Sequence, residues 1–284
     1  MSRRGSLVNP AERIPVKPPE TKLNRHVVVC NWNSSGPLLV RQVKAAVFTE
    51  KRSIVVVTEH MESLSICDLA SDPSEYAGIT GISGSPTLEA NLRRADIDTA
   101  GSVLILADQE SDSRRGETAG INASDAQSIV IALTLHHINP DVWICSELAE
   151  ERNREHLLRA HVSEIVSTGH MGAKLIAQAL LTPGLTMLFG EMLANTPQTS
   201  EPYHVPVPPA LEGSSMRDVQ RWAIGQRIVP VAYADRFGLI VNPSDDVVVG
   251  PGGRMVVLAL DQSQATAGVA ALVASMGGDA TASW

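Results

Sequence analysis

The residues that come closest to a recognisable chemistry lie near the start of the chain, in a turn that could bind a dinucleotide. Residues 26–36 read His-Val-Val-Val-Cys-Asn-Trp-Asn-Ser-Ser-Gly, so that an apolar run ends in a polar, turn-forming loop. A dinucleotide-binding turn carries Gly-x-Gly-x-x-Gly at this place, because only glycine lets the backbone close on a pyrophosphate. Of these glycines the sequence keeps only Gly36.

A second nucleotide candidate is Glu59, which follows the apolar run 53–58. An acid after the second strand is where a dinucleotide fold holds a ribose hydroxyl. Gly36 and Glu59 together could therefore support binding of NAD or ATP, although the other glycines are missing. The alternative is a turn that serves only the fold, with Trp32 as a packing anchor or as a lid over the edge of the sheet.

Other chemistries find little support in the sequence. The three cysteines, Cys30, Cys67 and Cys145, lie far apart and form no Cys-x-x-Cys pair, so we expect reduced, buried thiols. No Ser-His-Asp order, no paired acids in a cleft and no activated cysteine are evident. The sequence therefore does not predict an enzyme.

Composition excludes further classes of protein. The 284 residues are 44% hydrophobic and 19% charged, which is typical of a globular protein. A net charge of -8 makes nucleic acid an unsuitable partner, since binding phosphates needs basic patches. The start of the chain lacks the apolar segment of a signal peptide, and charges and prolines interrupt its longest apolar stretch. We expect a soluble, cytoplasmic protein.

Strand and helix patterns alternate along residues 26–168. Residues 1–25 contain three closely spaced prolines and are predicted to form a linker or arm. Helices are expected at residues 37–47, 61–69, 88–95, 124–136 and 150–160, with a long polar loop at 108–122. Strands are expected at residues 27–30, 53–58, 79–82, 102–107, 142–146 and 164–167. Repeated units of this kind predict an α/β domain with a Rossmann-like, doubly wound parallel sheet.

The pattern changes after residue 168. Two apolar helices are expected at residues 171–181 and 185–193, joined by Pro183-Gly184, within a crossover segment of residues 169–200. They would pack on another subunit, or alternatively fold back on the sheet. Short strands with turn signals follow, at residues 203–207, 228–233, 239–241 and 255–260, with a helix at 215–223. Residues 201–284 are thus predicted to form a small α+β C-terminal subdomain and tail.

Several motifs occur together in a characteristic order. They are His26-Val-Val-Val-Cys-Asn-Trp, Ser83-Gly-Ser-Pro-Thr, Val103-Leu-Ile-Leu-Ala-Asp, Ser124-Asp-Ala, Ile144-Cys-Ser-Glu-Leu and Pro183-Gly-Leu. Over about residues 25–261, this ordered set resembles the RCK domains (regulator of potassium conductance), which are related to KTN/TrkA nucleotide-binding domains. The motifs are most similar to those of Castor/Pollux-type ion channels. Asn31 departs from the glycine usual in that family.

The resemblance implies a function: binding of a ligand in the cytosol, which a ring of RCK domains converts into opening of a potassium or other cation channel. The crossover helices would form an intertwined homodimer, and dimers would assemble into a tetrameric or octameric ring. The channel pore would belong to a longer form of this chain or to a separate subunit. The domain would then lie at the cytosolic face of a membrane.

The resemblance also implies a calcium site. In calcium-gated relatives, acids after the fourth and fifth strands bind Ca²⁺, and the matching residues here are Asp125 and Glu147. Asp108, Glu110 and Asp112 could add oxygens, since Ca²⁺ takes six to eight of them. Ala149 replaces a second acid found in some relatives. The alternative is that Asp125 stabilises a helix N-terminus and that Glu147 is a solvated acid.

Two other functions remain open. One is a nucleotide-binding regulatory subunit of a potassium transporter, of the KTN type. The other is an NAD-dependent oxidoreductase, against which the missing glycines argue.

Overall fold

The computed structural model describes residues 25–47, 53–60, 79–108, 121–194, 200–223 and 226–275. They belong to two compact units whose boundary lies between Leu181 and Thr182, inside the segment predicted as a crossover. The predicted helix at 61–69, most of the arm and most of the loop at 108–122 lie outside the described residues.

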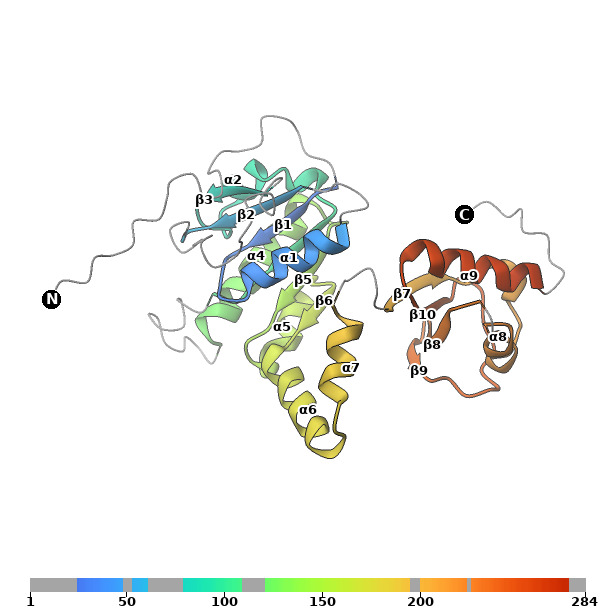
Figure 1. The fold of residues 1–284 in the computed structure, drawn as a ribbon. Coiled ribbons are helices and arrows are strands. Elements are labelled where there is room, and N and C mark those ends of the chain that lie inside the picture. The colour runs from blue at the N-terminus through green and yellow to red at the C-terminus, as the bar shows by residue number, and fades with distance from the viewer. Residues whose placement is uncertain are drawn as a thin grey trace. The chain divides into compact units, whose positions relative to one another are not determined.

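The first unit is built on a six-stranded sheet (Figure 1). Its strands are β1 (Val27–Cys30), β2 (Ile54–Thr58), β3 (Ile79–Ser83), β4 (Ser102–Ile105), β5 (Trp143–Glu147) and β6 (Glu164–Val166). The strand order is β3-β2-β1-β4-β5-β6, and every neighbouring pair is parallel. This order confirms the predicted doubly wound sheet of Rossmann type.

Both faces of this sheet are buried, which explains why its strands are formed by continuous apolar segments of the sequence. All five residues of β2 are buried, as a parallel sheet covered on both sides requires. On one face, Val27 and Val29 join a core cluster with Val40 of α1 (Gly36–Val47). On the other face, Val28 and Cys30 belong to the cluster that contains buried apolar residues of three further helices.

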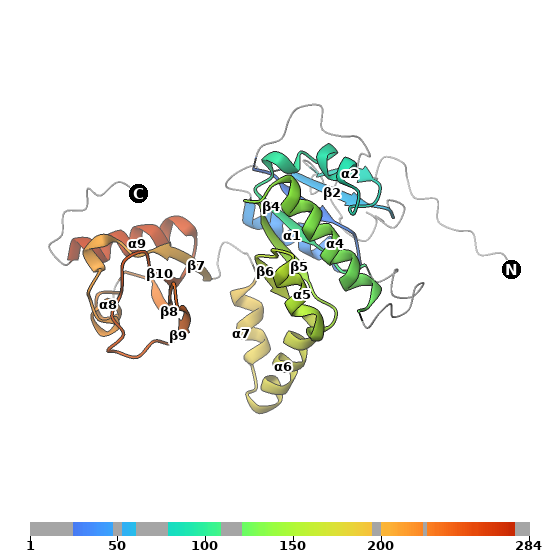
Figure 2. The same cartoon turned by 180° about the vertical axis from the view of Figure 1, so that it is seen from behind.

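Those three helices are α2 (Glu89–Arg94), α4 (Ala123–Ile138) and α5 (Arg154–Arg159). Figure 1 shows the sheet with α1 in front, and Figure 2 shows α2 and α4 in front. The sheet is therefore sandwiched between helices, and its carboxyl-terminal edge is left for the loops that follow β1, β4 and β5. This edge is where doubly wound folds bind ligands.

The helix predicted at residues 150–160 differs from the structure. A 3-10 turn, η6 (Glu151–Asn153), precedes α5, which begins only at Arg154. Asn153 is buried, and its side-chain amide donates a hydrogen bond to the carboxylate of Asp125 at 2.7 Å. A continuous α-helix was the wrong prediction, because this inward-turned side chain shapes the first turn.

The described cysteines are free thiols, and Cys30 is buried as predicted, whereas Cys145 is only partly buried. Burial raises the pKa of the Cys30 thiol to about 12. Burial also raises the pKa of Cys145, with a smaller contribution from the nearby charge of Glu164. A thiol with a raised pKa is a poor nucleophile at neutral pH. Cys67 lies outside the described residues.

Two helices occupy the predicted crossover segment. They are α6 (Thr168–Leu181) and α7 (Leu185–Met192), and neither contains a buried residue. Gly184 between them has a φ of 89°, in the left-handed region that favours glycine. Within the part of the chain that the structure describes, no helix has the length and apolarity needed to cross a bilayer.

The C-terminal part of the second unit is a small antiparallel sheet with two α-helices, which confirms the predicted α+β subdomain. Its strands, in the order β7-β10-β8-β9, are β7 (Glu201–Pro206), β8 (Val229–Asp235), β9 (Gly238–Val241) and β10 (Arg254–Ala259). The helices α8 (Met216–Ala223) and α9 (Gln262–Ser275) share a core with the sheet that contains Met216, Tyr233 and Val257. A 3-10 turn, η7 (Pro209–Leu211), completes it.

Candidate functional site

The turn after β1 keeps the backbone shape of a glycine turn without the glycine. Asn31 has a φ of 65°, in the left-handed region that asparagine tolerates better than most residues. Its side-chain amide donates to the carbonyl oxygen of Leu106, just beyond β4, at 3.1 Å. Asn31 therefore provides the conformation expected of the family's glycine and also joins β1 to β4.

Trp32 explains why Gly36 is retained. The indole is only 9% exposed and lies against the first residue of α1. A Cβ atom on Gly36 would lie 2.8 Å from two of the indole carbons, which is closer than side chains approach. The indole thus fills the space beside the start of α1, where a dinucleotide turn leaves room for a pyrophosphate.

Substitution of Gly36 by alanine is expected to destabilise the protein by about 1–3 kcal/mol, the usual cost of overpacking a core. The measurement is urea unfolding of the wild type and the variant. Gly172→Ala is the matched control, because a Cβ on Gly172 in α6 meets nothing within 4 Å. An equal loss of stability in both variants, or none at Gly36, would contradict the packing role.

Glu59, the other nucleotide candidate, immediately follows β2 and is exposed. Gly36 has a packing neighbour that accounts for its identity, whereas Glu59 has no such explanation. Binding of a nucleotide at these two residues stays a prediction.

A cluster of hydrogen bonds surrounds Glu147 at the carboxyl-terminal edge of the sheet. One carboxylate oxygen, Oε2, accepts a hydrogen bond from the Asn33 amide at 2.9 Å and from the Ala107 backbone N–H at 3.0 Å. The other, Oε1, accepts from the Thr168 hydroxyl at 3.3 Å. The Asn33 amide also donates to the Ala107 carbonyl at 3.0 Å. Glu147 therefore connects the loops after β1 and β4 to the first residue of α6.

Asp125 has a different environment. Its side chain is fully buried in the first turn of α4, where Asn122 caps the helix by accepting from the Asp125 N–H. The carboxylate accepts from the Ala149 N–H at 2.9 Å, from the Glu150 N–H at 3.1 Å and from the Asn153 amide. It thus holds the loop between β5 and α5 onto the start of α4.

Asp125 and Glu147, which the sequence grouped as one calcium site, have different hydrogen-bond partners in the structure. Asp125 binds the loop after β5, whereas Glu147 points to the turns after β1 and β4. Asp108 is buried just after β4, while Glu110 and Asp112 lie outside the described residues. Among the residues that are described, no group of three or more His, Cys, Asp and Glu could hold a metal ion. The calcium set stays a prediction.

The two acids share one electrostatic property. Every hydrogen-bond donor to Asp125 and Glu147 is a neutral amide, backbone N–H or hydroxyl. Within the described parts of the chain, neither carboxylate forms an ion pair with Lys, Arg or His. Two negative charges without a cationic partner lie near one edge of the sheet, in a protein that is acidic as a whole.

Sequence reasoning missed Asn33 and Asn153. Asn33 was part of the turn that drew attention, but nothing in the sequence indicated its contact with Glu147, 114 residues away. Asn153 was assigned to the interior of a helix, and only its type, a poor helix former, could have indicated otherwise.

Comparison with known proteins shows which proteins this chain is similar to. Residues 22–146 match the family described as calcium-activated potassium channel slowpoke-like RCK domain. The chain is 22% identical, over 245 residues, to the calcium-gated potassium channel TvoK of Thermoplasma volcanium, covering 86% of this chain and 65% of TvoK. It is also 22% identical, over 248 residues, to the ion channel POLLUX of Lotus japonicus, covering 83% and 25% of the two chains.

A solved structure agrees with these sequence matches. The human SLO3 gating ring superposes with a TM-score of 0.61 at 20% identity, covering 84% of this chain and 45% of that chain. The chain spans less than two thirds of each of these relatives. The resemblance to an RCK domain that the motifs indicated is confirmed.

Proposed function

We propose that this chain, whose residues 22–146 match the slowpoke-like RCK domain, is a cytosolic ligand-sensing module that regulates a potassium or other cation channel. The observation that carries the proposal is that Asp125 and Glu147 lie near one edge of the sheet without an ion-pair partner among the described residues. Relatives named as channels, rather than enzymes, support a regulatory role. The pore would lie in a longer form of this chain or in a separate subunit.

We further propose that the ligand is Ca²⁺ and that Glu147 is its principal protein ligand. Ca²⁺ prefers carboxylate and carbonyl oxygens. Glu147 is partly exposed, and the Ala107 carbonyl lies beside it through their shared contact with Asn33. Asp125, being fully buried and bonded to three donors, is better suited to holding the adjacent loop than to direct coordination.

Assembly follows from exposed apolar side chains. The exposed apolar side chains of α6 are Met171, Ile176, Leu180 and Leu181, and those on α7 or directly after it are Met187, Leu188, Phe189 and Leu193. Because neither helix contains a buried residue, these side chains support a homodimer formed through the crossover. Further exposed apolar side chains of the first unit are Val130 and Leu133 on α4, Trp143 on β5 and Leu158 on α5. A tetrameric or octameric ring needs a second contact between subunits, and we propose that these side chains take part in it.

Isothermal titration of the purified chain with CaCl₂ tests the ligand. Wild-type protein is expected to bind Ca²⁺, and Glu147→Gln to bind it at least about tenfold more weakly, because the number of charged oxygens sets calcium affinity. Glu155→Gln, which removes an exposed carboxylate of α5, is the matched control and should bind like the wild type.

Parallel titrations with ADP, ATP and NAD distinguish the alternatives. Tight nucleotide binding without a calcium response would replace this proposal with the KTN-type function. A calcium affinity that is the same in the Glu147 and Glu155 variants would remove Glu147 from the site.

A further inference from the structure

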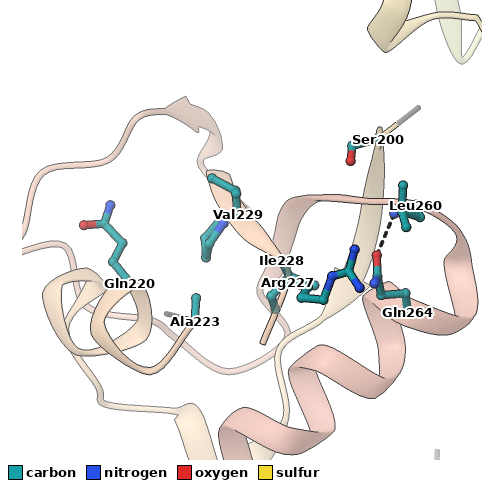
Figure 3. A pocket seen from close by; sticks show the side chains of 9 residues that line it. Ser200, Gln220, Ala223, Arg227, Ile228, Val229, Leu260 and Gln264 are labelled. Carbon is teal, nitrogen blue, oxygen red and sulfur yellow. Dashed lines mark hydrogen bonds between the residues drawn. The ribbon is translucent and has the colours of Figure 1, made fainter. Parts of the chain in front are cut away.

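The C-terminal subdomain contains a pocket that the proposed function does not use. It lies between the end of α8, the start of β8 and the start of α9, and its volume is about 650 Å³ (Figure 3). This volume falls within the range of about 300–1,000 Å³ found for small-molecule sites. The described residues that line it all belong to the second unit, so the pocket does not depend on the calcium site.

Apolar side chains form most of the lining. They are Ala223 from α8, Ile228, Val229 and Pro230 at the start of β8, and Leu260 before α9. Ala223 and Ile228 are buried and form the floor, whereas Val229 is 57% exposed and forms part of the rim. A lining of this kind suits the hydrocarbon body of an organic molecule.

Two of the polar lining residues, Gln264 and Arg227, offer hydrogen-bond donors, while Ser200 and Gln220 can both donate and accept. The Gln264 carbonyl oxygen already accepts from the Leu260 N–H at 2.7 Å, drawn as the dashed line in Figure 3. The amide nitrogen of Gln264 is therefore the group left to interact with a ligand, and it can only donate. Arg227 adds a guanidinium with five donors. Asp261 caps α9 through the Gln264 N–H and does not line the pocket.

Among the described residues that line the pocket, Arg227 is the one cation and none carries a carboxylate. In the described part of the chain, its guanidinium has no ion-pair partner. Its backbone has a φ of 57°, a left-handed conformation that is unfavourable for arginine. Backbone conformations of this kind occur preferentially at binding and active sites.

The single positive charge of the described lining residues indicates the charge of the ligand. One guanidinium matches one negative charge and binds a carboxylate through paired hydrogen bonds. A phosphate dianion would leave one charge unmatched in an acidic protein. We propose that this pocket binds a small monocarboxylate with an apolar body, with its carboxylate on Arg227 and Gln264 and its hydrocarbon on Ile228 and Leu260.

Titration calorimetry of the full chain with three probes tests the proposal: hexanoate, its neutral isostere hexanamide, and inorganic phosphate. Hexanoate is expected to bind saturably and at least about tenfold more tightly than either of the other two. Arg227→Gln should weaken hexanoate binding about tenfold or more, while Arg227→Lys, which keeps the charge, should retain part of it. Arg236→Gln removes an exposed arginine elsewhere in the same subdomain and serves as the matched control.

A second variant keeps the test independent of Arg227. Val229→Glu places a negative charge on the exposed rim and should repel hexanoate while leaving the fold intact, as circular dichroism would verify. The proposal is overturned if hexanoate does not bind, if hexanamide or phosphate binds as tightly, or if Arg227→Gln and Arg236→Gln behave alike. None of these results depends on Ca²⁺, so failure here leaves the calcium proposal standing.

Discussion

The double substitution Ile176→Lys and Leu180→Lys in α6 is expected to convert the proposed homodimer into a monomer. The two side chains are 73% and 84% exposed and lie four residues apart, on the same side of the helix. Burial of each apolar side chain contributes about 1.5–3 kcal/mol, and two lysines would add like charges across a symmetric interface. The dimer should therefore weaken at least about 100-fold.

Light scattering during size-exclusion chromatography, over a range of protein concentrations, measures this change. Gln178→Lys is the matched control, because it adds the same charge on the opposite side of α6 and should leave the dimer intact. A wild-type protein that is monomeric at high concentration, or a double variant that remains dimeric, would refute the assignment of this surface.

Asp125→Ala is expected to lower the free energy of unfolding by about 3–5 kcal/mol. The substitution leaves three donors, the Ala149 and Glu150 N–H groups and the Asn153 amide, without their acceptor. A buried donor that loses its partner costs about 1–3 kcal/mol, part of which water entering the space would recover. Because folded domains are stable by only about 5–15 kcal/mol, this variant lies close to the limit of folding.

Urea unfolding measures the loss, with Asp141→Ala as a control that removes an exposed aspartate. Asp125→Asn keeps one acceptor oxygen and should lose less stability than Asp125→Ala. Equal stability of Asp125→Ala and Asp141→Ala would show that the network around Asp125 contributes nothing. These unfolding data also bear on the calcium titration, because an Asp125 variant that is unfolded would lose calcium binding whether or not Asp125 is a ligand. The calcium titration therefore uses Glu147→Gln.

The sheet could be predicted from the sequence, because its determinants are local. A run such as 54–58 is apolar and β-branched throughout, and its alternation with helical patterns leaves few arrangements other than a parallel sheet. The order of the six strands was not predicted and comes from the structure. The boundaries were less accurate, since helix ends depend on contacts such as the one between Asn153 and Asp125.

The candidate site could be predicted only in part. The edge of the sheet and its acids were identified, because strand ends can be read from the sequence. The partners of those acids were not, since Glu147 meets residues 114 and 40 positions away in the chain. Side-chain pairing of this kind arises from packing of the completed fold. For the same reason, the sequence offered Trp32 as a packing anchor without indicating its contact with Gly36, and it did not indicate the pocket at Arg227.

The hydrogen bonds of Glu147 have a mechanical consequence. The same carboxylate fastens the turn that carries Asn33 and the first residue of α6, Thr168. A cation that took over its oxygens would compete with both contacts, and the two attachments would loosen or tighten together. Occupancy of the Glu147 carboxylate by a cation would therefore change how firmly the start of α6 is held to the turn after β1.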